Sequence, residues 1–136
     1  MTATPQTTGR LLKRAQYRNH RAADRALAAI GTTLVQWDAL RAIDEAPGAS
    51  AHALAVATFQ SDQSFGTLAA RLVAQGLVER APGVGRRVEH RLTDAGRRVL
   101  EAGMAVTAEV TARSFAELSA AELETLHGLL ERVGEA

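Results

Sequence analysis

Apolar residues recur every three or four positions from about residue 6 to residue 30, which is the period of an α-helix. The residues on this face are Leu12, Ala15, Asn19, Ala22, Ala26 and Ile30. A second stripe along the same segment consists of Arg14, Arg18, Arg21 and Arg25. Gly31 follows and predicts the end of the helix. The pattern therefore predicts a long helix with an apolar face and a basic stripe beside it.

Three shorter helices are predicted between residues 33 and 76. Each follows a hydroxyl side chain that can accept a hydrogen bond from the free N–H groups of the first helical turn. These caps are Thr33, Ser50 and Ser61. Pro47 ends the first of the three helices, and Gly76 ends the third.

The apolar period changes from 3.6 to 2 after Gly76, which is typical of β-strands. Residues 77–80 and 88–92 form two such alternating segments, and the glycines between them predict a hairpin. Thr93 can cap a long helix, and Ser119 with the glutamate three residues later forms a capping box for a last one. The predicted fold class is therefore mainly α with a small β-hairpin.

The order of the elements within residues 33–92 is that of a winged helix-turn-helix. In this arrangement one helix enters the major groove of DNA and a β-hairpin reaches an adjacent groove. The helices at 50–57 and 61–75 would form the helix-turn-helix, and the hairpin would be the wing. One compact domain is expected, because the chain has 136 residues and contains neither internal repeats nor a linker.

Four segments carry a more specific signal. They are Leu34–Ile43, Ala53–Ala55, Leu68–Arg80 and Val88–Gly96, and the last two hold an arginine–leucine…glycine–leucine–valine block followed by leucine–threonine…glycine. These segments resemble the MarR family of bacterial transcriptional regulators, and the resemblance covers essentially the whole chain. It implies a homodimer joined by the flanking helices, whose two winged domains bind a pseudo-palindromic operator on double-stranded DNA. It also implies a repressor that small, often aromatic, ligands release.

Two positions depart from the family pattern. Family wings usually carry an aspartate two positions before an arginine at the tip, and Val84 stands in that place before Arg86. Family recognition helices usually carry arginine or lysine on the exposed face, whereas no basic residue precedes Arg71 in the predicted helix. These departures keep open an alternative function, a winged-helix module that regulates through a protein partner, with weak or lost DNA binding.

The expected domain has three parts. Residues 1–32 form an N-terminal dimerisation helix, residues 33–93 the winged helix-turn-helix, and residues 94–136 the C-terminal dimerisation helices. Residues 1–32 carry six basic residues and one acid, whereas residues 101–136 carry two basic residues and seven acids. Opposite charges favour contact between the two ends, within one chain or between two copies. The alternative is that both charged faces are solvated and do not meet.

The predicted recognition helix exposes side chains that can read base edges. Glutamine can bond to N6 and N7 of adenine together, and serine and threonine reach several base edges. On the wing, two glycines would let the tip approach DNA, and arginine suits a narrow minor groove because of its negative potential. The candidate DNA-binding residues are His52, Gln60, Ser61, Gln63, Ser64, Thr67, Arg86 and Arg87. The alternative is a solvated helix face beside an ordinary surface hairpin.

A small-molecule effector would bind between the flanking helices and the winged domain. Tyr17 and Trp37 are the candidate lining residues, because they are bulky aromatics with a polar atom. The alternative places Trp37 in the core.

Gly66, within the recognition helix, has two interpretations. It allows either close packing on the preceding helix or close approach of the backbone to DNA.

The composition excludes several other classes of function. The chain has no cysteine, which excludes disulfides and thiol chemistry, and its four histidines lack metal-ligand spacing. No nucleophile, base and orienting partner occur together, so we expect neither an enzyme nor a cofactor. No secretory signal and no apolar run of about 18 residues is present, so we expect a cytoplasmic protein that does not enter the membrane.

Overall fold

The structure, a computed structural model, describes residues 2–85 and 87–134. Its helices are α1 (Pro5–Ala28), α2 (Leu34–Glu45), α3 (Ala51–Ala57), α4 (Asp62–Ala74), α5 (Asp94–Ser114) and α6 (Ala120–Arg132). Its strands are β1 (Val78–Pro82) and β2 (Val88–Leu92). The fold class, mainly α with a small β-hairpin, is confirmed.

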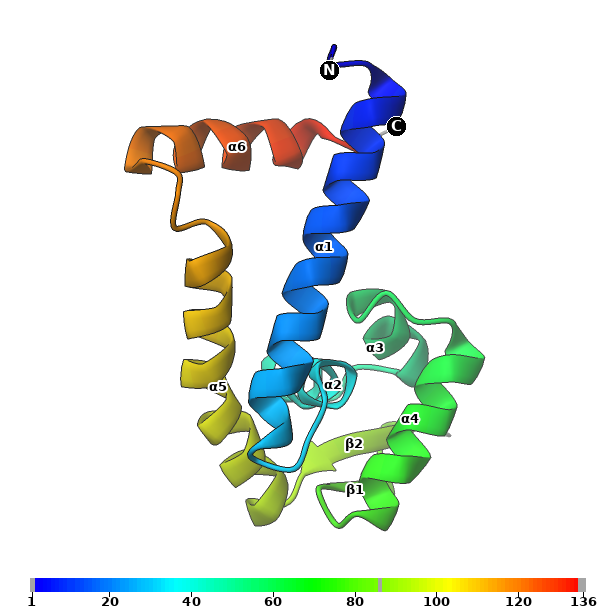
Figure 1. Ribbon diagram of the computed structural model, residues 1–136. Coiled ribbons are helices and arrows are strands. Elements are labelled where there is room, and N and C mark those ends of the chain that lie inside the picture. The colour runs from blue at the N-terminus through cyan, green and yellow to red at the C-terminus, as the bar shows by residue number, and fades with distance from the viewer. Residues whose placement is uncertain (1, 86, 135–136) are drawn as a thin grey trace.

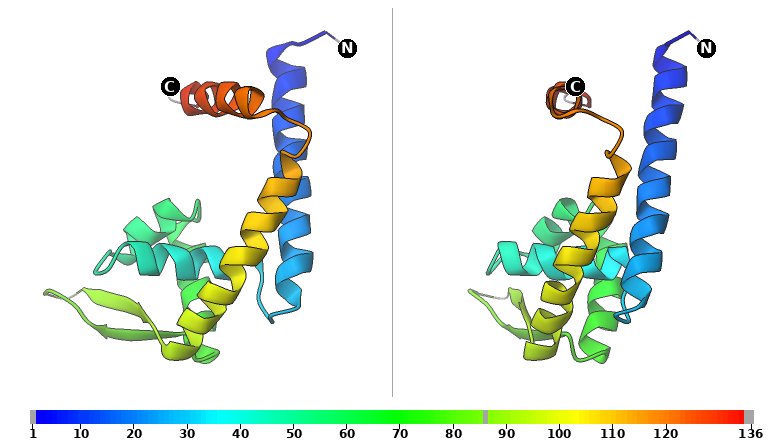
Figure 2. Two further views of the ribbon diagram at one scale, coloured as in Figure 1. Left: turned by 90° about the vertical axis from the view of Figure 1, so that its left-hand side faces the viewer. Right: turned by 60° about the vertical axis from the view of Figure 1, so that its left-hand side comes forward.

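Helices α2, α3 and α4 and the hairpin form a winged core, from which α1 and α5 rise as a two-helix arm (Figure 1). Helix α6 turns away from the end of α5 and stands apart from α1, as both views of Figure 2 show. The hairpin projects from the core on the side away from the arm (Figure 2). The chain therefore places its wing and its flanking helices at opposite sides of one compact core.

A hydroxyl side chain begins each of these six helices. The caps are Thr4, Thr33, Ser50, Ser61, Thr93 and Ser119, and each side-chain oxygen accepts a hydrogen bond from a backbone N–H of the first turn. At Ser119 the predicted capping box is complete, because its N–H donates to the side chain of Glu122 at 2.9 Å. The sequence pattern predicts all of these caps except Thr4.

The apolar face of α1 differs from the prediction. The buried residues of this helix are Ala23 and Leu27, whereas Leu12 and Ala22 on the predicted face are exposed. Alanines occupy so many positions of α1 that its sequence defines the contact face poorly. The packing against α5 and α2 decides which stripe is buried.

One apolar core joins the arm to the winged region. Its largest fully buried side chains are Leu27, Leu40, Leu54, Phe65, Leu72 and Val78. Trp37 lies in this core and is 9% exposed, and its indole Nε1 donates to the carbonyl oxygen of Leu100 at 3.0 Å. At that point α5 passes so close that a Cβ on Gly103 would lie 2.3 Å from Trp37 Nε1. The contact requires glycine at this position of α5.

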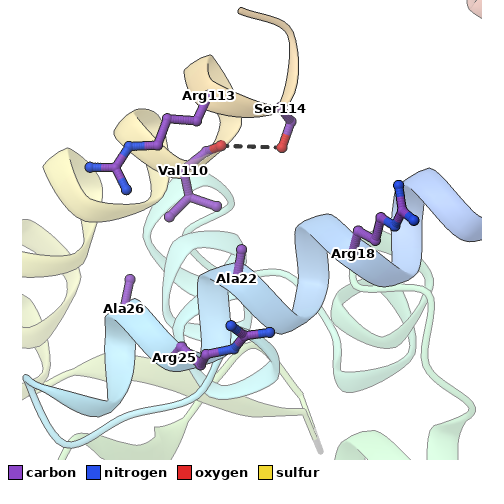
Figure 3. Close-up of a pocket in the computed structure, with 7 residues that line it drawn as sticks. All are labelled: Arg18, Ala22, Arg25, Ala26, Val110, Arg113 and Ser114. Carbon is purple, nitrogen blue, oxygen red and sulfur yellow. Dashed lines mark hydrogen bonds between the residues drawn. The ribbon is translucent and has the colours of Figure 1, made fainter.

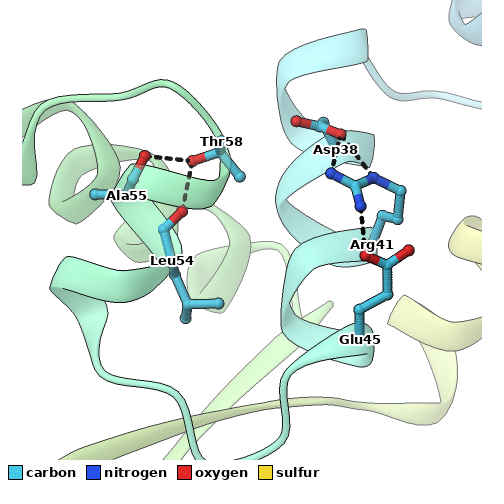
Figure 4. A network of polar contacts seen from close by, with 6 residues as sticks. All are labelled: Asp38, Arg41, Glu45, Leu54, Ala55 and Thr58. Atoms are coloured by element: carbon cyan, nitrogen blue, oxygen red, sulfur yellow. Dashed lines mark hydrogen bonds and ion pairs between the residues drawn. The ribbon is translucent and has the colours of Figure 1, made fainter. Parts of the chain in front are cut away.

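Local polar contacts stabilise α2 and the end of α3. On α2, Arg41 bonds to Asp38 at 2.8 Å and to Glu45 at 2.6 Å (Figure 4). At the end of α3, the hydroxyl of Thr58 donates to the carbonyl oxygen of Leu54 at 2.8 Å. Thr58 is buried, so this bond satisfies a polar group that water does not reach.

The hairpin pairs its strands antiparallel, from Val78 opposite Leu92 to Pro82 opposite Val88. Strand β1 begins one residue later than predicted and continues to Pro82. After β2, the hydroxyl of Thr93 donates to the carbonyl oxygen of Gly76 at 2.6 Å. This bond ties both ends of the wing to the start of α5.

Replacement of Gly103 by alanine tests the close contact between α5 and Trp37. Because the added methyl group would overlap the indole, Gly103→Ala is expected to lower the free energy of unfolding by about 1–3 kcal/mol. Urea denaturation measures the change. The control is Gly66→Ala in α4, where nothing lies within 4 Å of the added Cβ. It is expected to raise the free energy of unfolding by about 0.5–1 kcal/mol, and equal effects of the two variants would contradict the overlap.

Candidate nucleic-acid interface

Helix α4 divides into a buried face and an exposed polar face. Phe65, Ala69 and Leu72 enter the core, whereas Gln63, Ser64 and Thr67 are exposed. The three polar residues therefore share the outer surface of the predicted recognition helix. An exposed polar face of this kind is the geometry that base readout in the major groove requires.

The hydroxyls of this face are partly engaged within α4. Ser61 caps the helix and donates from its hydroxyl to the Ser64 hydroxyl at 3.0 Å, and the Thr67 hydroxyl donates to the carbonyl oxygen of Gln63 at 3.2 Å. The Gln63 amide makes no hydrogen bond with any residue in the described part of the chain. Among the predicted reading residues, Gln63 therefore has its full set of donors and acceptors available.

A side-chain pair connects the first turns of α3 and α4. His52 Nδ1 lies 2.8 Å from Asp62 Oδ1. A carboxylate only accepts hydrogen bonds, so Nδ1 carries the donated proton, and Nε2 is the ring nitrogen that remains for another contact. Asp62 stands outside the eight predicted DNA-binding residues, but the sequence already gives its carboxylate two interpretations, repulsion of phosphate or acceptance of a hydrogen bond from N4 of cytosine.

The turn between α3 and α4 has an unusual backbone. Phe59 has a φ angle of +57°, in the left-handed region that favours glycine, and its side chain is 94% exposed. Helix-turn-helix turns often contain glycine at such a position. Gln60, one of the predicted DNA-binding residues, follows it and is half-buried, and its N–H donates to the carbonyl oxygen of Ala55 at 2.9 Å.

The wing tip is closed by backbone hydrogen bonds. The N–H of Gly83 donates to the carbonyl oxygen of Arg87 at 2.8 Å, and the side chain of Arg87 is exposed. Val84, at the position where the family pattern has an acid, is 92% exposed. Arg86 lies outside the described residues. The described tip therefore presents one apolar and one basic side chain.

A buried histidine joins the wing to the recognition helix. His90 of β2 is 8% exposed, and its ring meets the Phe65 ring of α4 edge-on, with centroids 6.0 Å apart. Its Nδ1 is buried and has no hydrogen-bond partner among the described residues. Burial, and secondly the charge of Arg80 on the neighbouring strand, hold the pKa of His90 below its ordinary value.

Gly66 lies on the exposed side of α4. Nothing lies within 4 Å of a Cβ added there, so close packing on the preceding helix, one of the two interpretations from the sequence, is wrong. The absence of a side chain instead leaves the backbone of α4 uncovered beside Gln63 and Thr67. That surface would let a DNA base or phosphate approach the helix closely.

The two predicted effector residues have different surroundings. Trp37 is a core residue with its polar atom bonded to α5, whereas Tyr17 is exposed and accepts a hydrogen bond from Arg21 at 3.1 Å. Neither lines the groove that runs between α1 and α5 (Figure 3). That groove measures about 550 Å³. Its apolar residues are Ala22, Ala26 and Val110, and Arg18, Arg25 and Arg113 surround them.

Helix α6 has no buried residue in its described length. A second groove, of about 430 Å³, runs along its apolar face between Leu118, Leu126 and Leu129. Helices α1, α5 and α6 leave further large apolar side chains exposed, namely Leu11, Leu12, Met104 and Leu130. Ile30, on the predicted apolar face of α1, packs against the core of its own chain.

Comparison with known proteins connects this geometry to a family. A model of the MarR family matches residues 30–87. The transcriptional repressor Rv2887 of Mycobacterium tuberculosis is 32% identical over 111 residues, which is 80% of each chain. The chain belongs to the MarR family. The match extends beyond the winged region into the flanking helices, as the resemblance of the four sequence segments implies.

Solved structures of similar proteins share the whole architecture. A probable transcriptional regulator from Pseudomonas aeruginosa has a TM-score of 0.83 at 33% identity, over 92% of this chain and 95% of that one. Rv2887 in complex with salicylic acid has a TM-score of 0.76 at 30% identity, over 98% of both chains. MarR-family proteins are DNA-binding transcriptional regulators and not enzymes, and this chain is therefore a transcriptional regulator.

No described helix of this MarR-family chain has the length and apolar character that a membrane span needs. The described residues likewise contain no group of three or more acids or histidines arranged to hold a metal ion.

Acidification tests the buried position of His90. Because its pKa is lowered on folding, the unfolded chain takes up the proton first as the pH falls below about 6.5, and stability falls with it. Urea midpoints at pH 7.5 and 5.5 are expected to differ more in the wild type than in His90→Leu. The matched control is His127→Leu, since His127 is exposed on α6. A wild-type loss that persists unchanged in His90→Leu would contradict this assignment.

Proposed function

We propose that this MarR-family regulator is a homodimeric repressor that binds pseudo-palindromic operators and resides in the cytoplasm. The observation that carries the proposal is the exposed polar face of α4, with Gln63 available, beside a wing that projects from the same core. Rv2887, a similar protein, has been solved in complex with DNA, with a TM-score of 0.76 over 98% of this chain.

In this proposal α4 enters the major groove and the wing lies along the neighbouring groove. Gln63, Ser64 and Thr67 face the base edges, and Arg87 with Arg86 supplies positive charge to the backbone or the minor groove. Ser61 acts mainly through its cap, which fixes the start of the helix, and His52 has Nε2 free for a phosphate. Gln60 supports the turn more than it contacts DNA, because it is half-buried.

Gln63→Ala tests base readout. The variant is expected to lose about 1–3 kcal/mol of binding free energy on the specific operator and to relax the preference at one base-pair position. Fluorescence anisotropy on the protein's own upstream DNA and on random DNA measures both affinities. Gln75→Ala, at the other end of α4, is the matched control and should bind like the wild type. Equal losses on operator and random DNA would contradict base readout by Gln63.

The same measurement on the wild type tests the alternative function. If the wild type has no salt-dependent affinity for DNA, a module that binds a protein partner is favoured.

Dimerisation is proposed from the unpartnered surfaces of the arm. Helix α6 buries none of its described residues within its own chain, and Leu11, Leu12 and Leu129 are exposed. Such a set of apolar side chains at one end of a molecule is typical of a protein interface. The acids on and near α6 would meet the basic stripe of α1 in the second copy, so charge would select the register while apolar burial supplies most of the free energy.

Sedimentation of the wild type and of a variant with a charge placed on the apolar face of α6 tests the dimer. The wild type is expected to remain dimeric in about 1 M salt, where screening is nearly complete, because apolar contacts dominate. Leu129→Glu is expected to sediment as a monomer, since it places a charge in the apolar groove of α6. Val56→Glu is the control, because Val56 is equally apolar and exposed but lies on α3. A wild-type monomer at high salt would show that the charges hold the copies together.

A small aromatic effector is proposed because the similar protein Rv2887 has been solved with salicylic acid. In this chain Trp37 is held in the core, so an effector that reached it would disturb the contact between α2 and α5. Such a disturbance would change the angle between the arm and the winged core. This is the physical route by which a ligand would release DNA.

A further inference from the structure

The pair formed by His52 and Asp62 places an acid at the start of the recognition helix. Asp62 is the first residue of α4, and its side chain is 70% exposed, so the carboxylate is not a buried support of the fold. His52 holds one carboxylate oxygen, Oδ1, at 2.8 Å. The second oxygen, Oδ2, has no hydrogen-bond partner among the described residues.

A carboxylate at this position restricts what the helix can approach. DNA phosphates are negatively charged, so Asp62 is repelled from the backbone. Among base edges in the major groove, the N4 amino group of cytosine donates a hydrogen bond and is the group that acidic side chains accept from. Residues at the N-terminal end of a recognition helix are the ones that contact base edges.

We propose that Asp62 selects cytosine at one position of each half-site and that His52 holds its carboxylate in the orientation that does so. Oδ2 of Asp62 accepts from cytosine N4, while His52 Nδ1 donates to Oδ1. The inference rests on the proposed function, because it requires α4 to lie in the major groove. It adds a second base contact, made by the Asp62 carboxylate, to those proposed for Gln63, Ser64 and Thr67.

His52 contributes by fixing one of the two carboxylate oxygens. Without it, the Asp62 side chain is free to rotate about its bonds, and its carboxylate loses the imidazole N–H that donates to Oδ1. The structure therefore makes His52 a positioning residue, and Asp62 the residue that contacts the base. A glutamine at position 52 retains an N–H donor that can reach the carboxylate.

Selection from randomised duplexes followed by sequencing tests the assignment. The wild type is expected to enrich cytosine about tenfold or more at one position per half-site, which corresponds to about 1.4 kcal/mol. Asp62→Asn is expected to change that preference to adenine, because asparagine bonds to N6 and N7 of adenine, while the rest of the motif stays the same. Asp62→Ala is expected to lose the preference without gaining another.

Further variants separate this role from general effects of charge and folding. Asp94→Asn is the matched control, since Asp94 is also the first residue of a helix and follows the cap Thr93, but it lies on α5. It should select the wild-type motif. His52→Ala is expected to broaden the cytosine position, and His52→Gln to restore it.

The outcomes distinguish the inference from the function on which it rests. If Asp62→Asn and Asp62→Ala select the same motif as the wild type, the base-reading role of Asp62 is overturned and DNA binding stands. If His52→Ala also leaves the motif unchanged while Asp62→Asn alters it, the positioning role of His52 fails alone. If the wild type enriches no sequence, both the inference and sequence-specific DNA binding are overturned.

Discussion

The contact between Trp37 and α5 determines how the two halves of this molecule sit relative to each other. The indole lies where α5 has glycine, at Gly103, and its N–H is bonded to the backbone of the preceding turn at Leu100. An aromatic ring fills the space and a hydrogen bond fixes its direction, so α5 cannot slide or rotate without breaking one or the other. The winged core and the arm are thereby held at a defined angle.

That angle matters because the two ends of the molecule have different tasks. The core presents α4 and the wing, and a second, buried contact between His90 and Phe65 holds those two elements together. The arm and α6 present apolar surface that their own chain does not cover. In a regulator whose arm joins two copies, the spacing of the two α4 helices depends directly on the packing around Trp37.

The recognition surface is chemically unusual in having so little positive charge on α4. Its first turns expose the amide of Gln63, the hydroxyls of Ser64 and Thr67, one glycine and one acid held by His52, and the exposed base Arg71 lies in the last turn. Such a face discriminates among bases more than it attracts the backbone. Attraction to DNA must then come from other elements, such as the wing with Arg87.

The sequence alone determined the helices, the hairpin and the winged order, because caps such as Thr33, Ser61 and Ser119 and the change of period after Gly76 are local signals. It also determined that Gln63, Ser64 and Thr67 share a face, since helical spacing fixes that. It did not determine which stripe of α1 is buried, because alanine fits either side of a helix, and it left Trp37 between core and pocket.

Only the tertiary structure decided contacts between residues distant in the sequence. His52 meets Asp62 because the turn at Phe59 brings two first turns together, and His90 is buried because β2 folds over Phe65. A Cβ added at Gly66 would meet no neighbouring atom, whereas one added at Gly103 would overlap Trp37, although both glycines lie within helices. Periodicity reports the direction of a side chain relative to its own helix, but the neighbour it meets is set by how the helices pack.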